Sequence, residues 1–516
     1  MGRTGRGAGA SAGVRSAYEG DLRRQSACEP AARTYARALP IVPVRARGLT
    51  IEGADGRRYL DCVSGAGTLA LGHNHPVVLE AIRRVLDSGA PLHALDLATP
   101  VKDAFLTELF RTLPPGLADR ARVQFCGPSG ADAVEAAFKL VRSATGRSDL
   151  LAFAGAHRGV TAAALGASGA AFAGRVTRLP YPQDYHCPFG VGGEHGAELA
   201  ARWTESALDD PRSGTPLPAG MILEPVQDEG GVIPAPDAWM RRVRQITAAR
   251  SIPLIADEIQ TGVGRTGAFW AVEHSGVTPD VMVLSKAIGG SLPLAVIVYR
   301  DDLGVGEPRP HGDMFRGNQL AMAAGTATLA YVRENRLAER AATLGARMLT
   351  RLRELATAFP LIGDVRGRGL MIGLEIVDTA GKERGVKSGG GDGASEIDGA
   401  GGGETHRSAD GGVSDVSGDE DPWADRCGDA WAEPELPPHA TTAPRPPAPE
   451  LAAAVQRECL RRGLIVELGG HHTSVVRLLP PLTISDEQAT AVLDRLADAV
   501  ETVARSHAHG DQRRPR

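Results

Sequence analysis

Residues 251–290 read SIPLIADEIQTGVGRTGAFWAVEHSGVTPDVMVLSKAIGG. Two short apolar runs in this stretch each lead to a charged residue. Asp257 directly follows the first run, 252–256. Lys286 follows the second run, 281–284, after Ser285. Apolar runs of this kind are typical of buried parallel strands, and ligands of α/β sheets bind beyond the carboxyl ends of the strands. The stretch therefore predicts an α/β sheet that brings Asp257 and Lys286 to one crevice.

The residue types of this pair suit one cofactor. A lysine that acts as a nucleophile is usually desolvated or close to another cation, so that part of it is neutral near pH 7. Pyridoxal phosphate needs such a lysine for its Schiff base, and it needs a carboxylate that keeps the ring nitrogen protonated. We therefore predict Lys286 and Asp257 as catalytic and cofactor-binding residues. The alternative is that both lie on the surface and follow apolar runs by chance.

Composition excludes several other classes of protein. With 516 residues the chain exceeds one typical domain, and its 42% hydrophobic and 23% charged residues are ordinary for a globular protein. A net charge of −5 and 4% aromatic residues do not suit nucleic acid or an anionic membrane. No stretch of eighteen apolar residues occurs, and the six cysteines lack CxxC spacing. We expect a cytoplasmic protein with reduced thiols.

A turn rich in small residues predicts an anion site. The sequence VQFCGPSGADAVEAAFKL (123–140) reads as a strand, a Gly-Pro-Ser-Gly turn and a helix that begins near Ala131. Small residues at a helix N-terminus let backbone N–H groups approach an anion, and Ser129 adds a hydroxyl group. Most such turns are simple helix caps. Because this one precedes the lysine stretch, we predict that Ser129, Gly130 and Ala131 bind a phosphate.

The Asp257–Lys286 stretch, with Glu258-Ile259-Gln260 and GVGRTG between them, resembles the class III (ω-amino) aminotransferases among the fold-type I pyridoxal phosphate enzymes. The resemblance implies an α/β fold with a mostly parallel seven-stranded sheet in a large domain and a smaller α+β domain. It implies that the Ser129 turn holds the cofactor phosphate and that Gln260 binds the phenolate oxygen. His157 stands where the family has the aromatic residue that stacks on the ring.

Two further residues are assigned by the same resemblance. MILEPVQDEGGV (221–232) resembles the family's EPVQGEGG motif, which makes Glu224 a buried structural acid. Glu229 then matches a gate that pairs with the substrate-carboxylate arginine and swings away when 2-oxoglutarate enters. Arg477, in VVRLLPPLT, matches that arginine, and arginine suits a planar carboxylate better than lysine does. The alternative is that Glu229 is a solvated loop acid.

Some positions depart from the family pattern. His157 replaces a larger aromatic residue, Arg158 replaces a histidine, and Asp313-Met314 replaces a Gly-Thr pair whose threonine donates to the phosphate. A methionine side chain cannot donate, so we expect weaker retention of the cofactor. No metal is expected, because His73 and His75 have no apparent third ligand and i, i+2 histidines before a proline are more often structural.

The chain divides into six predicted parts. The composition of residues 379–449, rich in Gly, Ser, Asp and Pro and strongly acidic, predicts an insertion that cannot bury enough apolar surface to order itself. A single long helix is expected over about 317–356. The predicted parts are a disordered N-terminus (1–28), a segment that packs with the small domain (29–75), the large cofactor domain (76–330), the small domain (331–378 and 450–505), the disordered insertion (379–449) and a disordered tail (506–516).

Within the family, four stretches are most similar to diaminobutyrate–2-oxoglutarate transaminases. They are SGAGTLALGHNHP (64–76), HALDLATPVKDAF (93–105), GPSGADAVEAAFKL (127–140) and MFRGNQLAMAAG (314–325). The implied reaction is ping-pong transfer of the ω-amino group of L-2,4-diaminobutyrate to 2-oxoglutarate, which gives aspartate 4-semialdehyde and glutamate, or the reverse.

Three alternatives stay open at this point. One is another ω-aminotransferase, of the ornithine, acetylornithine or 4-aminobutyrate type. The second is a pyridoxal phosphate racemase or decarboxylase, and the third is a non-catalytic paralogue with weakened cofactor binding. Family members have their active sites at subunit interfaces, so we expect a homodimer whose partners are a small amino donor and a 2-oxo acid.

Overall fold

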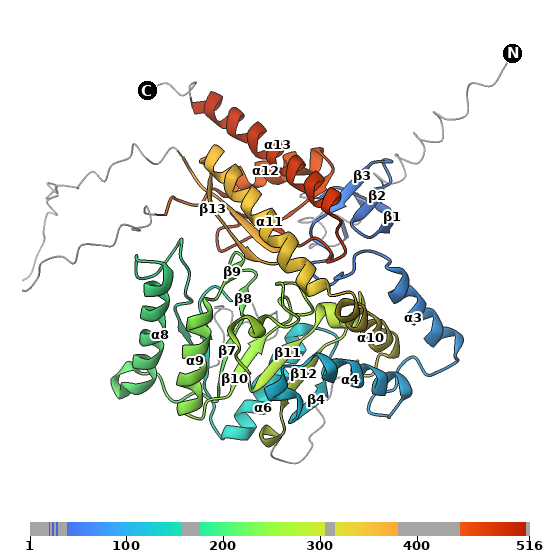
Figure 1. Ribbon diagram of the computed structural model, residues 1–516, viewed down its shortest axis with the longest axis vertical. Helices are drawn as coiled ribbons and strands as arrows, with labels where there is room; N and C mark the ends of the chain where they lie inside the picture. The colour runs from blue at the N-terminus through green and yellow to red at the C-terminus, as the bar shows by residue number, and fades with distance from the viewer. Residues whose placement is uncertain are drawn as a thin grey trace, which may run out of the picture. The chain divides into compact units, whose positions relative to one another are not determined.

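The computed structural model describes residues 39–156, 176–304, 315–379 and 444–511, together with residues 20, 23–24 and 27–28 (Figure 1). Contacts divide the chain into two units, one of residues 1–379 and 443–516 and the other of residues 380–442. Every helix and strand given below belongs to the first unit. The predictions for His157, Arg158, Asp313 and Met314, and for most of the insertion, lie outside the described residues.

A seven-stranded sheet forms the centre of residues 121–300, as the family resemblance implies. Its strand order is β4-β12-β11-β10-β7-β5-β6. The β12 strand is antiparallel to both of its neighbours, and the other pairs are parallel, so the sheet is mostly parallel. The strands are β4 (Ala121–Phe125), β5 (Leu150–Phe153), β6 (Val176–Leu179), β7 (Gly220–Leu223), β10 (Leu254–Asp257), β11 (Val281–Leu284) and β12 (Val296–Arg300).

The apolar runs of β10 and β11 are buried on both faces of this sheet. Successive side chains of a strand point to opposite faces. Ile255 and Val283 belong to the core cluster beneath helix α6, whereas Ala256 and Met282 belong to the larger core on the other face. Such two-sided burial explains why both strands are continuously apolar in sequence and are not alternating.

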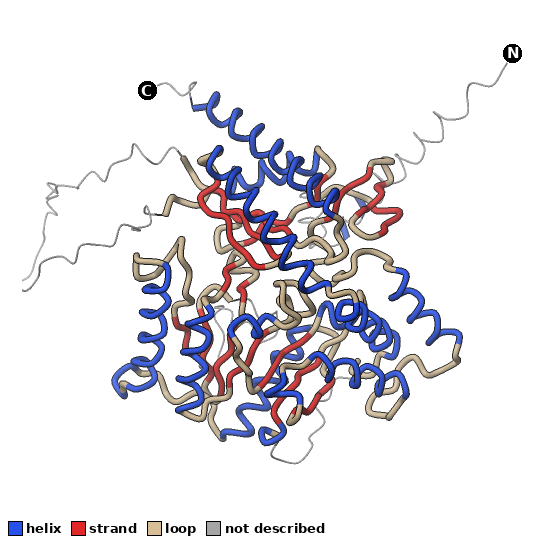
Figure 2. Tube along the Cα trace, viewed as in Figure 1, coloured by secondary structure: helices blue, strands red, loops and turns tan. Residues whose placement is uncertain are grey.

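Smaller sheets lie above the large one in the view of Figure 2. One has the order β13-β14-β17-β16 and is antiparallel, and another has the order β1-β2-β3-β15. In the latter, β3 from the N-terminal hairpin pairs in parallel with β15 from the C-terminal part. The third pairs β8 with β9. The strands of these sheets are β1 (Pro43–Arg47), β2 (Thr50–Gly53), β3 (Arg58–Asp61), β8 (Val226–Gln227), β9 (Ile233–Pro234), β13 (Ile362–Arg368), β14 (Met371–Ile376), β15 (Leu464–Ile465), β16 (Glu467–Gly469) and β17 (Val475–Leu478).

Helices surround these sheets, and α6 packs on β11, β12 and β7. Among the described helices, none combines the length and apolar character needed to cross a membrane. The α-helices are α3 (Pro76–Asp87), α4 (Pro100–Thr112), α5 (Pro115–Ala118), α6 (Gly130–Thr145), α8 (Gly193–Asp209), α9 (Asp237–Ala249), α10 (Gln319–Glu334), α11 (Leu337–Ala358), α12 (Pro449–Arg461) and α13 (Asp486–Asp511). Short 3₁₀ helices are η1 (Pro211–Ser213), η2 (Ala271–Ser275), η3 (Lys286–Gly289) and η4 (Asp301–Leu303).

The structure corrects three predicted limits. The single helix expected over about 317–356 is two helices, α10 and α11, because Arg336 has a left-handed φ of 50° that ends one helix before the next begins. Helix α13 continues to Asp511, beyond the start of the predicted tail at residue 506. Pro447 forms a β-bridge with Val377, so the last residues of the predicted insertion already belong to the fold. The division into domains itself stays a prediction.

Candidate active site

Lys286 lies where β11 ends, at the first position of η3. Its φ of 52° is in the left-handed region, which a residue with a side chain rarely adopts and which recurs at functional sites. The preceding Ser285 fixes this turn, because its hydroxyl group donates to the Leu294 carbonyl oxygen at 2.9 Å. The Lys286 ammonium group donates to Oε1 of Gln260.

Asp257 ends the neighbouring strand β10 and is 4% exposed. It lies opposite Val283 in the parallel β10–β11 ladder, three positions before Lys286. Its Oδ1 accepts a hydrogen bond of 3.1 Å from the backbone N–H of Ile259. Because the two strands are parallel, Asp257 and Lys286 reach the same edge of the sheet, as the sequence predicts.

The Ser129 turn begins helix α6 beside this edge. Ser129 is the N-cap and forms a capping box with Asp132, whose carboxylate accepts from the Ser129 hydroxyl group at 2.7 Å. A Cβ at Gly130 would lie 2.7 Å from Cδ1 of Ile259, so the lack of a side chain at Gly130 lets the turn pack closely against the Asp257–Gln260 segment. Ala131 follows as a buried residue in the first turn of α6. The predicted phosphate-binding residues therefore lie against the segment that carries Asp257.

Gln260 has a buried amide nitrogen, Nε2, with no hydrogen-bond partner among the residues that the structure describes. Its Oε1 already accepts from Lys286, so an additional acceptor is needed beside Nε2. A Cβ at Gly67 would lie 2.7 Å from the same amide, which shows that the 64–67 loop leaves room there through glycine. These groups fit pyridoxal phosphate. The lysine suits its aldehyde, the carboxylate its ring nitrogen, the unpaired amide donor its phenolate oxygen, and the helix N-terminus its phosphate.

Arg477 lies on β17 with its side chain 3% exposed, and three carboxylates surround it. Its NH1 is 2.9 Å from Oε1 of Glu229 and 3.1 Å from Oδ1 of Asp228, and its NH2 is 3.0 Å from Oε2 of Glu467. A Cβ at Gly469 would lie 2.7 Å from the Arg477 Nε, so the β16 strand makes space for the guanidinium group through glycine. The structure thus brings Glu229 and Arg477 together, as expected, and adds two further acids.

The charges around Arg477 shift the pKa values of Arg477 and Glu467. Burial lowers the pKa of Arg477, but the charges of Asp228, Glu229 and Glu467 more than offset this effect and raise it. Burial also raises the pKa of Glu467, and Arg477 only partly offsets this, because its charge is shared with Asp228 and Glu229, which raise the pKa further. Lys286 also acts on Glu467 and lowers its pKa, so the charges of the lysine and of the arginine cluster interact.

Comparison with known proteins places the chain in a family. The family model described as aminotransferase class-III matches residues 31–397. The chain belongs to the class-III aminotransferases. A diaminobutyrate–2-oxoglutarate aminotransferase of Rhizobium meliloti is 47% identical to it over 94% of this chain and 93% of the relative. A protein of the same name from Haemophilus influenzae is 40% identical over 93% and 94% of the two chains.

Solved structures agree with the fold of this class-III aminotransferase. An (S)-enantioselective ω-transaminase from Thermomicrobium roseum has a TM-score of 0.72 at 25% identity, over 92% of this chain and 95% of that one. An amine transaminase from an uncultivated Pseudomonas species, solved in its PLP-bound form, has a TM-score of 0.69 at 26% identity, over 90% and 95% of the two chains. The cofactor of the family, and of this aminotransferase, is pyridoxal phosphate.

Several residues around the site of this aminotransferase have structural roles. Glu224 is buried, and its carboxylate accepts from the backbone N–H of Asp228 at 3.1 Å. Arg265 is buried and donates to the carbonyl oxygens of Leu370 and Pro480, which ties the GVGRTG turn to the C-terminal part of the chain. Burial lowers the pKa of Arg265 to about 10.

The two histidines of the GHNHP motif also have structural contacts. Nε2 of His73 is 2.8 Å from the Asp61 carboxylate, and the ring of His75 packs edge-on against Tyr331 with the centroids 4.7 Å apart. Such contacts support the structural interpretation of the motif over a metal site.

Sequence reasoning missed two of the acids around Arg477. Asp228 directly precedes the predicted gate, but its side chain was not assigned a role. Glu467 is ten positions from Arg477 in sequence, yet the β16–β17 register places the two residues directly opposite each other. The signal that could have found it is the hairpin pattern of residues 467–477, in which two short strands flank a turn that begins at Gly470.

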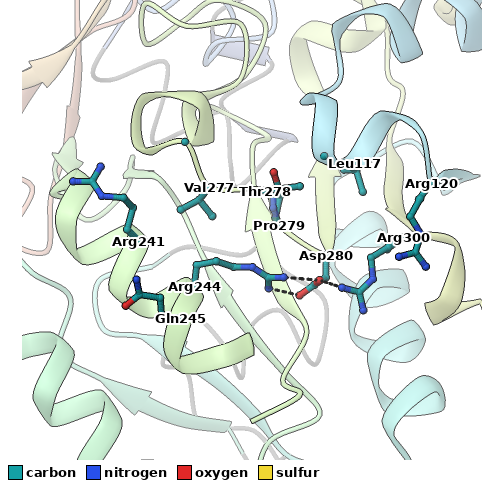
Figure 3. A pocket seen from close by; sticks show the side chains of 12 residues that line it. Leu117, Arg120, Arg241, Arg244, Gln245, Val277, Thr278, Pro279, Asp280 and Arg300 are labelled. Atoms are coloured by element: carbon teal, nitrogen blue, oxygen red, sulfur yellow. Dashed lines mark hydrogen bonds and ion pairs between the residues drawn. The ribbon is translucent and has the colours of Figure 1, made fainter. Parts of the chain in front are cut away.

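A cavity of about 460 Å³ lies at the opposite edge of the sheet, where β11 begins and β12 ends (Figure 3). Arginines line it, but the two central ones, Arg244 and Arg300, point at the buried Asp280 carboxylate and bind it at 2.6 Å each. Asp280 also accepts from the backbone N–H of Leu254 at 2.8 Å. The cluster therefore holds α9, β10 and β12 together on the side of the sheet away from Lys286.

Proposed function

We propose that this class-III aminotransferase transfers the ω-amino group of L-2,4-diaminobutyrate to 2-oxoglutarate, or catalyses the reverse reaction. The observation that carries the proposal is the 47% identity, over nearly the whole of both chains, to an aminotransferase named for these two substrates. The Arg477–Glu229 pair supports it independently, because an enzyme with one carboxylate-binding arginine and two unlike substrates needs to mask that arginine in one half-reaction.

The residues at the sheet edge suit the roles predicted for them. Pyridoxal phosphate, when bound, supplies an aldehyde that takes up amino groups and a protonated ring that withdraws electrons from the substrate carbon. Lys286 would hold the cofactor through its amine and, once released, would serve as the general acid and base that takes the proton from the substrate carbon. Asp257 would keep the ring nitrogen protonated, the Nε2 group of Gln260 would donate to the phenolate oxygen, and the Ser129 turn would bind the phosphate.

The ion pair between Arg477 and Glu229 is closed in the donor half-reaction and open in the acceptor half-reaction. The Glu229 side chain is 46% exposed, so it can turn away from Arg477 into solvent. While Glu229 is in place, it neutralises part of the arginine charge and a donor binds by its ω-amine. When Glu229 leaves, Arg477 presents a planar pair of donors to the acceptor's α-carboxylate.

The assembly and the location of the protein belong to the same proposal. We infer a homodimer with a two-fold interface, the common arrangement for soluble homo-oligomers. We also infer a cytoplasmic location, which is supported by five described cysteines that form no disulfide with one another. Light scattering of the purified protein measures the first inference directly, and a monomer would contradict it.

A donor panel tests the proposed reaction. The purified holoenzyme is mixed with one amino donor at a time, and the cofactor absorbance is followed before and after 2-oxoglutarate is added. We expect diaminobutyrate to change the spectrum faster than ornithine, acetylornithine or 4-aminobutyrate, and 2-oxoglutarate to reverse the change. A faster response to one of the other amines would assign that substrate instead. A spectrum that 2-oxoglutarate does not reverse would indicate a racemase or decarboxylase, and no cofactor absorbance would indicate a non-catalytic paralogue.

A further inference from the structure

Arg477 has more acidic partners than a single movable gate requires. Of its three carboxylates, Glu229 is the exposed one at 46%, whereas the side chains of Asp228 and Glu467 are 10% and 24% exposed. The backbone N–H of Asp228 is bound by Glu224, and Glu467 lies directly across the β16–β17 ladder from Arg477. When Glu229 swings away, the other two acids therefore stay beside the guanidinium group.

The negative charge that remains after Glu229 leaves repels the carboxylate of an acceptor. With Glu229 displaced, Asp228 and Glu467 already exceed the single positive charge of Arg477. An incoming α-carboxylate would add a third negative group within ion-pair distance of one guanidinium. Like charges in a poorly solvated site repel strongly, so one of the acids must lose its charge or leave.

Glu467 is the acid whose surroundings favour the neutral form. The charged groups that act on it are Arg477 from β17, Asp228 and Glu229 from the loop after β8, and Lys286 from the turn after β11. Helix α12, which packs on β16, contributes a neutral contact, because the Gln456 amide donates to the Val466 carbonyl oxygen. Among the described residues, the ion pair with Arg477 is the one polar contact of the Glu467 carboxylate.

We propose that Glu467 determines specificity for the acceptor, because its carboxyl group takes up one proton from solvent whenever an acceptor carboxylate binds Arg477. The proposal rests on the proposed function, since it takes Arg477 as the site of the acceptor carboxylate. The neutral carboxyl group no longer repels the acceptor, and it can donate its proton to a carboxylate oxygen. With Glu467 ionised, the cluster repels anions and does not repel the ammonium groups of a diamino acid donor.

This linkage gives the two substrates different pH dependences. Burial raises the pKa of Glu467, so the group can take up a proton closer to neutral pH than an exposed glutamate can. Above that pKa, binding that requires one added proton weakens by about tenfold per pH unit. The KM for the acceptor should therefore rise with pH, while the KM for the donor should not follow this rise.

Calorimetry of glutarate binding tests the proposal without turnover. Glutarate is a dicarboxylate that lacks the reactive carbonyl group, and the holoenzyme is titrated with it in two buffers of different ionisation enthalpy. We expect proton uptake approaching one per site in the wild type and none in Glu467→Gln. Glu467→Asp, which keeps a carboxylate, should retain the uptake. In kinetics at alkaline pH, Glu467→Gln should lower the KM for the acceptor about tenfold with little change in kcat.

The control is Glu198→Gln, on the exposed face of α8, which should bind glutarate as the wild type does. Glutarate binding without proton uptake in the wild type would overturn the proposal, and so would equal uptake in Glu467→Gln. The donor-induced change in absorbance reports on the proposed reaction separately. One outcome is that no amine donor changes the spectrum while glutarate still binds with proton uptake that depends on Glu467. In that case the proposed substrates are wrong, but the proton linkage at Glu467 is correct.

Discussion

Replacing Arg477 by methionine should separate the two half-reactions. The substitution keeps an unbranched side chain of similar length and removes the charge that the acceptor carboxylate needs. A charge-assisted hydrogen bond contributes about 1.5–3 kcal/mol, so we expect the acceptor half-reaction to lose about 10- to 150-fold in kcat/KM. The donor half-reaction should change much less, because Glu229 covers Arg477 while the donor binds.

The same substitution should lower stability. Arg477 is 3% exposed, and its loss leaves the carboxylates of Asp228 and Glu467 poorly solvated and without a cation. Removing one partner of a buried ion pair typically costs about 3–5 kcal/mol in the free energy of unfolding. Arg477→Lys is the matched control: it keeps the charge, so it should preserve most of the stability, but it loses the planar pair of donors.

Stopped-flow absorbance measures each half-reaction by itself, with donor alone and then with 2-oxoglutarate alone. Urea denaturation of the same samples measures stability. Equal losses in both half-reactions would refute the argument that Arg477 serves the acceptor. An unchanged acceptor half-reaction would refute it as well and would place the carboxylate site elsewhere.

Two further predictions concern the scaffold of the site. Burial raises the pKa of Glu258 to about 7 from 4.5, so the folded state holds this proton more tightly than the unfolded chain does. The wild type should therefore lose about 3 kcal/mol in the free energy of unfolding as the pH rises from 4.5 to about 7, and Glu258→Gln should not lose it. If the unfolding midpoints of the two proteins changed in parallel with pH, Glu258 would not be the group that holds this proton. Gly345→Ala in α11 would place a Cβ 1.9 Å from the Gly369 carbonyl oxygen, and the resulting overpacking should lower the free energy of unfolding by about 1–3 kcal/mol in urea denaturation. A variant as stable as the wild type would show that the helix can shift at no cost.

The parts of the site that are local in sequence could be predicted from it. An apolar run that ends at Asp257 and another that leads to Lys286 specify two buried strands, and parallel pairing then brings the two residues to one edge. The Ser129 turn was predictable for the same reason, because a cap, a glycine and a helix follow one another directly.

The acidic surroundings of Arg477 depend on register, which a linear motif does not contain. Glu467 meets Arg477 only because β16 and β17 pair with these residues opposite each other, and a slip of one position would turn either side chain to the other face. The break between α10 and α11 was missed because residues 319–358 are helical in composition, and the left-handed backbone at Arg336 has no marker such as glycine.

Covalent labelling shows whether Lys286 carries the cofactor. Treatment of the holoenzyme with borohydride makes the bond between cofactor and protein permanent, and mass spectrometry of the peptides then locates the labelled amine. We expect the label on Lys286 and no label in Lys286→Ala, while Lys139→Ala, at an exposed position of α6, should be labelled as the wild type is. A label on another lysine, or a label that survives in Lys286→Ala, would show that Lys286 does not carry the cofactor.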